Sequence, residues 1–204
     1  MNIEQIAVCN QKRINKDYYL LEMNAPLCAD RAKPGQFVHI RIPQLDGSVL
    51  RRPFSIFDAR KGIVKIIYKV VGRGTEAMTK LHKGDTLNLI GPLGNGFPRP
   101  QADKIPVIVA GGYGAAPLFF FASYYKKKGI AFLGGKTADD IIFPDKFKKM
   151  GWKVKVATEN GSSGDKGLVT DIFDAWRAGD KAGRCGRIEC FVCGPDGLLK
   201  AIAI

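Results

Sequence analysis

Several features of metal-binding, membrane and secreted proteins are scarce in this chain of 204 residues. It has only two histidines, His39 and His82, and neither lies near cysteines or carboxylates at a metal-binding spacing. The five cysteines are an odd number, and no basic segment followed by an apolar stretch opens the chain, so a disulfide framework is not expected. No run approaches the roughly 18 apolar residues of a membrane span. We therefore expect a cytoplasmic protein that holds no metal and contacts no membrane.

Common catalytic signatures are also missing. Neither H-E-x-x-H nor G-x-S-x-G occurs, and residues 134–137 do not complete a P-loop, because Ile130 stands where its first glycine would be. Cys185, Cys190 and Cys193 have the spacing of three ligands of a plant-type [2Fe–2S] site. No fourth cysteine follows, and the last two lie in an apolar, strand-like run. We interpret them as buried structural thiols, or Cys193 as a thiol near a ligand.

Acidic residues are few: 19 against 32 Lys and Arg, which gives a net charge of +13. Such a surface attracts anions, whether nucleotides, nucleic acid or an acidic protein. The basic residues are spread along the chain with only short clusters at 126–128 and 146–149 and no interleaved aromatic ladder, which favours solvated helix faces over a nucleic-acid interface. We expect no nucleic-acid partner.

The first half of the chain consists of short, strand-like runs separated by turns. The runs are 6–9, 18–23, 36–42, 55–57, 63–71 and 86–90. Turn residues lie between them, among them Asp46 and Gly47, and only 75–81 looks helical. Six short strands without long helices predict an N-terminal antiparallel β-barrel.

The second half alternates apolar strands with helices. Residues 91–100, with three glycines and three prolines, break every periodicity, so we expect the domain boundary there, with domains at 1–98 and 99–204. Strands are predicted at 106–110, 130–133, 154–158 and 190–193, and helices at 116–128, 144–150, 170–177 and from 197 onward. This order predicts a doubly wound parallel sheet with helices on both faces.

Three stretches suggest nucleotide binding. In residues 50–56, Arg52 and Ser55 flank Pro53 and Phe54; the proline is expected to turn the strand so that arginine and serine face one ligand, which leaves Arg51 to solvent or a partner. The other two stretches are glycine turns that precede predicted helices. One contains Gly111, Gly112 and Gly114, and the other contains Gly74 with Thr75 as the helix cap.

Taken together and in this order, the motifs resemble the ferredoxin–NADP⁺ reductase superfamily. Within it, residues 34–39, 50–56, 91–97, 158–162, 166–170 and 193–195 are most similar to the electron-transfer subunits of dihydroorotate dehydrogenases, enzymes of pyrimidine biosynthesis. The resemblance covers the whole chain.

The resemblance implies a flavoprotein that passes electrons from NADH through FAD to a catalytic dihydroorotate dehydrogenase subunit or another redox protein, in a hetero-oligomer. FAD would be held by Arg52, Pro53, Phe54, Ser55, Ile67, Tyr68, Lys69, Gly74 and Thr75. NAD(H) would be received by Gly111, Gly112, Gly114, Thr158, Glu159, Cys193, Gly194 and Pro195. No residue acts as an acid or base, because hydride passes directly from nicotinamide to flavin.

The chain departs from the family at two places. Tyr113 stands where glycine is usual, which is expected to narrow the turn or let the ring cover the site. Family members also carry a cysteine-rich segment that ligates a [2Fe–2S] cluster, and its ligands are missing here, so we expect a shortened form or a two-cofactor variant. Two alternatives stay open: a related reductase subunit of a hydrogenase, sulfide or ferredoxin:NADP⁺ oxidoreductase, and a basic nucleic-acid-binding module. The preference for NAD or NADP is also open, although Lys136 would favour a 2′-phosphate.

Overall fold

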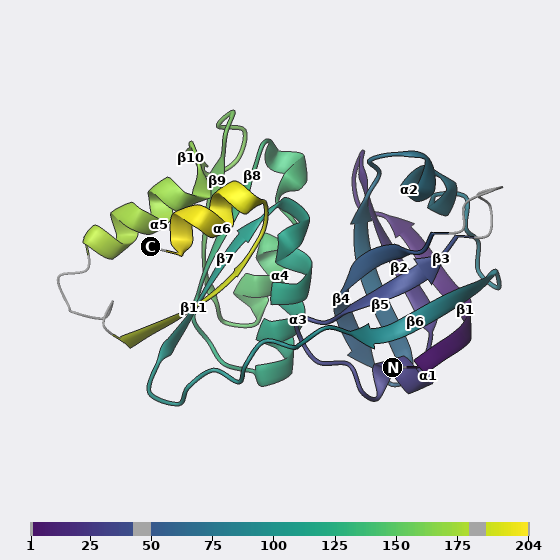
Figure 1. Cartoon of the computed structure of the whole chain (residues 1–204). Helices are drawn as coiled ribbons and strands as arrows, with labels where there is room; N and C mark the ends of the chain where they lie inside the picture. The colour runs from purple at the N-terminus through teal and green to yellow at the C-terminus, as the bar shows by residue number, and fades with distance from the viewer. Residues whose placement is uncertain (1, 43–49, 180–186, 204) are drawn as a thin grey trace. The chain divides into compact units, whose positions relative to one another are not determined.

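The computed structural model describes residues 2–42, 50–179 and 187–203 and divides the chain into two compact units, Met1–Phe97 and Pro98–Ile204 (Figure 1). The predicted turn at Asp46 and Gly47, and Cys185, lie outside the described residues. No helix among the described residues combines the length and apolar character needed to cross a membrane.

The first unit is a closed antiparallel barrel, as predicted, and its strand order is β1-β2-β5-β4-β3-β6. Its strands are β1 (Asn2–Arg13), β2 (Tyr18–Asn24), β3 (Phe37–Arg41), β4 (Arg52–Arg60), β5 (Ile63–Lys69) and β6 (Thr86–Leu93), and its helices are α1 (Pro26–Ala29) and α2 (Arg73–Met78). Every second residue points into the barrel, so Leu21, Val38, Ile56 and Ile66 are completely buried. These side chains form the core that fixes the strand register.

Two expectations for this unit were wrong. The helix α1 was not predicted, because four residues are too few to show a periodicity. The glycine and proline at 91–92 do not end the strand: β6 continues to Leu93, and Gly91 pairs with Asn2. A Cβ atom on Gly91 would lie 2.7 Å from Cγ1 of Val38, so the glycine lets two strands of the barrel pack closely.

The second unit is a parallel sheet with strand order β10-β9-β8-β7-β11. Its strands are β7 (Ile105–Gly111), β8 (Ile130–Gly135), β9 (Lys153–Thr158), β10 (Asp165–Lys166) and β11 (Ile188–Cys193). Its helices are α3 (Ala115–Tyr125), α4 (Pro144–Lys149), α5 (Val169–Ala178) and α6 (Asp196–Ile202), with short 3₁₀ turns η1 (Gly112–Gly114) and η2 (Ala138–Asp140).

The helices cover both faces of this sheet, as predicted: α3 and α4 lie on one face, and α5 and α6 on the other (Figure 1). Phe173 and Val169 of α5 pack on Phe132 and Val109 of the sheet. The chain runs from β7 through α3 to β8 on one side, and β11 pairs with β7 on the other. The strand order therefore reverses between β7 and β11, the position at which such sheets collect ligands at their carboxyl ends.

Candidate functional site

The predicted flavin motif begins β4 and is a regular strand. Arg52, Pro53, Phe54 and Ser55 pair in unbroken register with Ile40, His39, Val38 and Phe37 of β3. Successive side chains therefore alternate: Phe54 is buried on the same face as Arg52, while Pro53 is exposed on the face of Ser55. The expectation that Pro53 turns the strand was wrong, and Arg52 and Ser55 lie on opposite faces of β4. The register shift of β4 against β5 lies further on, between Ile56 and Asp58.

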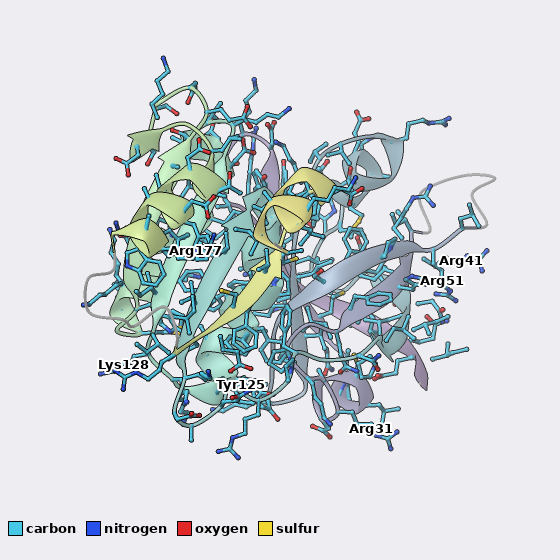
Figure 2. All side chains as sticks on the ribbon, turned by 60° about the vertical axis from the view of Figure 1, so that its left-hand side comes forward. Arg31, Arg41, Arg51, Tyr125, Lys128 and Arg177 are labelled. Atoms are coloured by element: carbon cyan, nitrogen blue, oxygen red, sulfur yellow. The ribbon has the colours of Figure 1, made fainter. Side chains whose placement is uncertain are left out.

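The two neighbouring arginines have different partners. Arg51 donates from Nη1 to the backbone oxygen of Asn88 on β6 at 3.0 Å, and from Nη2 to the side-chain oxygen of the same residue. The prediction that Arg51 faces solvent or a partner was therefore wrong. Arg51, labelled in Figure 2, directly precedes β4. The guanidinium of Arg52 donates to the backbone oxygen of Leu50 at 3.1 Å.

The second strand of the predicted site, β5, pairs directly with β4. Ile67 and Tyr68 are buried there, and Lys69 is half-buried with its ammonium 5.3 Å from the ring centre of Tyr18. The hydroxyl of Tyr68 donates to Oε1 of Gln11 at 3.0 Å. Burial, and to a smaller extent Tyr19, raises the pKa of Tyr68 far above its usual range, so this hydroxyl keeps its proton and remains a donor.

The glycine turn after β5 leads into α2, in which Gly74 and Thr75 occupy the first turn. The capping position belongs to Gly72, so the prediction that Thr75 caps this helix was wrong. Its hydroxyl instead accepts the amides of Val71 at 2.9 Å and Gly72 at 3.3 Å, and donates to the backbone oxygen of Gly72 at 3.0 Å. A hydroxyl with two acceptor sites and one donor is then fully used, so Thr75 offers a ligand its backbone N–H rather than its side chain.

The residues of β4, β5 and α2 supply a donor set suited to a pyrophosphate. The amides of the first turn of α2 have no partner within the helix, and the exposed Arg73 lies among them. The missing side chain of Gly72 leaves open space, because a Cβ atom there would meet no atom within 4 Å. The guanidinium of Arg52 is the further cation that β4 contributes.

In the second unit, two glycine turns predicted to bind NAD(H) pack directly against each other. A Cβ atom on Gly111 would lie 2.9 Å from Cδ of Pro195, and one on Gly114 would lie 2.7 Å from the carbonyl carbon of Cys193. A side chain fits at neither position, because the turn after β7 packs directly against the turn after β11. Gly112 has φ of +54°, in the left-handed region that favours glycine, and Tyr113 is 62% exposed, so its ring does not fill the turn.

The residues predicted at the end of β9 differ in accessibility. Thr158 is completely buried, and its hydroxyl donates to the backbone oxygen of Ser163 at 2.9 Å and accepts the amide of the same residue at 3.0 Å. In this arrangement Thr158 closes the loop that follows β9. Glu159 is exposed, and its amide donates to the backbone oxygen of Gly135 at the end of β8. Glu159 thus lies beside the exposed Lys136.

The two described cysteines of β11 have different surroundings. Burial raises the pKa of the half-buried Cys193, so its thiol is neutral at physiological pH and places no charge at the turn. Cys190 is exposed, so the prediction of a buried thiol was wrong for this residue. Among the residues that the structure describes, no three His, Cys, Asp or Glu side chains gather as a metal site.

One residue of the barrel site was not predicted. Gln11 of β1 contacts both Tyr68 and the end of α2. A register shift between Val8 and Asn10 turns Gln11 to the face of Leu21, inside the barrel. The sequence alone shows no such shift, so a polar residue at this position reads as a surface residue.

Comparison with known proteins identifies the family. A family model described as the oxidoreductase FAD-binding domain matches residues 5–97. The dihydroorotate dehydrogenase B (NAD(+)) electron transfer subunit of Fusobacterium nucleatum subsp. nucleatum is 36% identical over an alignment of 209 positions, which covers 99% of this chain and 79% of that protein. The protein of the same description from Geobacillus kaustophilus is 34% identical over 98% of this chain and 77% of its own. The chain belongs to this family of electron transfer subunits.

Solved structures agree with this membership. An NADH-dependent reduced ferredoxin-NADP oxidoreductase superposes with a TM-score of 0.78 at 29% identity, over 95% of this chain and 69% of that chain. A ferredoxin-NADP⁺ reductase from Plasmodium falciparum superposes with a TM-score of 0.80 at 17% identity, over 99% of this chain and 89% of that chain, which shows the fold alone. The family is thus one of oxidoreductase electron transfer subunits with the ferredoxin reductase fold.

Proposed function

We propose that the chain binds FAD on the domain at 1–98 and NAD(H) on the domain at 99–204, and that it passes electrons from NADH through FAD to a partner. The observation that carries this proposal is family membership over 99% of the chain. The relatives' description names dihydroorotate dehydrogenase, so the catalytic subunit of that enzyme is the proposed partner, in a hetero-oligomer. The proposed reaction is that of a flavin oxidoreductase, in which this chain carries electrons between the nicotinamide and the partner through FAD.

The proposed flavin site consists of residues on β4, β5 and α2. Arg52 and the first-turn amides of α2, including those of Gly74 and Thr75, would bind the pyrophosphate through charge-assisted hydrogen bonds. Pro53, Phe54, Ser55, Ile67, Tyr68 and Lys69 complete the proposed set. Because Arg52 and Ser55 lie on opposite faces of β4, they would contact different parts of the cofactor. When bound, FAD accepts a hydride and passes its electrons onward.

The proposed nicotinamide site is the carboxyl edge of the parallel sheet at β7 and β11. Gly112 leaves the backbone open to a dinucleotide, and the Cys193, Gly194 and Pro195 turn would lie beside the ring, while Gly111 and Gly114 keep the two turns together. The neutral thiol of Cys193 avoids a negative charge there. Thr158 would act by holding its loop and Glu159 by direct contact. No acid or base is required of these residues, because hydride transfer moves no separate proton.

A different electron acceptor is the second candidate. The match to an NADH-dependent reduced ferredoxin-NADP oxidoreductase at 29% identity favours a ferredoxin-type partner. The motifs of this chain would be the same in both cases, so capture of the partner from its own cells decides between them. Cofactor preference is part of this choice, because the exposed Lys136 favours a 2′-phosphate.

FAD uptake by the purified chain tests the proposal. We expect titration with FAD to quench free-flavin fluorescence with a one-to-one endpoint and to give a bound-flavin visible spectrum. A chain that takes up no FAD but binds nucleic acid with strong salt dependence would instead be the basic module that its net charge of +13 allows.

A further inference from the structure

A single side chain links the two ends of the segment that would hold the flavin pyrophosphate. Gln11 donates from Nε2 to the backbone oxygens of Met78 at 3.0 Å, Thr79 at 3.1 Å and Leu81 at 3.2 Å. Its Oε1 accepts the hydroxyl of Tyr68 at 3.0 Å. The amide group therefore connects β1 with the last residues of β5 and with the end of α2.

The chemistry of these partners fixes the orientation of the amide. The three backbone oxygens accept hydrogen bonds only, and the last carbonyls of a helix have no partner within it. The raised pKa of Tyr68 keeps its hydroxyl a donor. A flipped Gln11 amide would point its oxygen at three carbonyls, so one orientation satisfies both sides.

The link joins to β1 a segment that is also held by the buried side chains of Met78 and Leu81. The chain leaves β5 after Lys69, forms α2 and returns to the sheet at Thr86. The hydroxyl of Thr75 bonds the amides at the start of this segment, and Gln11 bonds the carbonyls at the end of its helix. Gln11 and the buried Met78 thus hold the end of α2, while Thr75 fixes the turn that precedes the helix.

We propose that Gln11 is a positioning residue of the flavin site: it holds α2 where its amides meet the pyrophosphate of FAD. This inference rests on the proposed function. Gln11 touches no part of the proposed cofactor and acts through Tyr68 and α2. It differs in this from Arg52, which would contact the phosphate itself.

The test compares variants of the full-length chain. Gln11→Met removes the hydrogen bonds to the three carbonyls and to Tyr68 at similar side-chain length. Gln11→Glu keeps an acceptor for Tyr68 but loses the donors to the carbonyls. Tyr68→Phe removes the hydroxyl alone. Gln5→Met is the matched control, because Gln5 lies on the same strand with an exposed side chain.

Two measurements separate positioning from general destabilisation. The first is the ratio of the dissociation constants for FAD and riboflavin, because riboflavin lacks the pyrophosphate that α2 would bind. We expect Gln11→Met and Gln11→Glu to weaken FAD about tenfold and riboflavin less than about twofold, the size expected when one or two net hydrogen bonds are lost. The second is hydrogen exchange without flavin, in which the amides of α2 should exchange about tenfold faster while β2 and β5 are unchanged.

The outcomes distinguish this inference from the proposed function. Equal weakening of FAD and riboflavin in Gln11→Met, or an equal effect of Gln5→Met, would overturn the positioning role. If the α2 amides of Gln11→Met exchange hydrogen as slowly as those of the wild type, Gln11 does not hold α2, whatever the flavin affinities. A wild-type chain that binds no FAD would refute the proposed function and the flavin role of Gln11 with it.

Discussion

The adjacent arginines Arg51 and Arg52, before and at the start of β4, give a matched pair of substitutions with opposite expected effects. Arg52→Ala should weaken FAD binding by about 10- to 100-fold, because the loss of a charge-assisted hydrogen bond costs about 1.5–3 kcal/mol. The stability of this variant should change little, since among the described residues the guanidinium of Arg52 bonds the nearby backbone of Leu50. Arg51→Ala should leave FAD affinity within about twofold. It should lower the free energy of unfolding by about 1–2 kcal/mol, because two hydrogen bonds to Asn88 on β6 are lost.

Flavin fluorescence titration measures the affinities, and urea unfolding followed by circular dichroism measures the stabilities. Both variants lose one positive charge from a chain of net charge +13, so a general electrostatic effect would act on both alike. If Arg52→Ala bound FAD as the wild type does, or if Arg51→Ala weakened FAD more than Arg52→Ala, the assignment of Arg52 to the phosphate would be wrong.

Two further predictions concern stability. Gly114→Ala should lower the free energy of unfolding by about 3 kcal/mol, since its Cβ would overlap the backbone of Cys193. Gly197→Ala should raise the free energy of unfolding by about 0.5–1 kcal/mol, because a Cβ atom there would meet no atom within 4 Å. Comparable losses of stability in both variants would contradict the packing of the two turns. Burial, and then Glu4, raises the pKa of Cys28 from 9.0 to about 12, so the unfolded chain loses that proton first as pH rises. Between pH 8 and 10 this difference in pKa should lower the free energy of unfolding of the wild type by about 1.4 kcal/mol. In Cys28→Ala the decrease in the free energy of unfolding over the same range should be smaller by that amount, and an equal decrease in both proteins would contradict the raised pKa.

The architecture could be predicted from the sequence because local signals agree with it. Turn residues between apolar runs mark the barrel strands, and alternating strands and helices mark the parallel sheet. The same signals failed where pairing between distant residues decides the outcome. A glycine at position 91 predicts the end of a strand, yet β6 continues through it to Leu93. Glycine is needed there because the neighbouring Val38 leaves no room for a side chain.

The predicted site residues come from segments that the fold brings together, but the orientation of their side chains could not be predicted. The strands β4 and β5 pair directly, and α2 follows β5 in the chain. Which face each side chain occupies depends on register, and the unbroken pairing of β4 with β3 separates Arg52 from Ser55. Likewise, the partner of Arg51 is 37 residues away, and Gln11 reaches the barrel interior through a register shift that leaves no mark in the sequence.

The central claim is that this chain carries electrons from a nicotinamide to a flavin. Its most direct test is anaerobic titration of the FAD-loaded chain with NADH, followed by the visible absorbance of the flavin. We expect NADH to bleach the bound flavin, with about one equivalent required for full reduction. Bound FAD that keeps its absorbance with excess NADH, and with NADPH in a parallel titration, would contradict the claim.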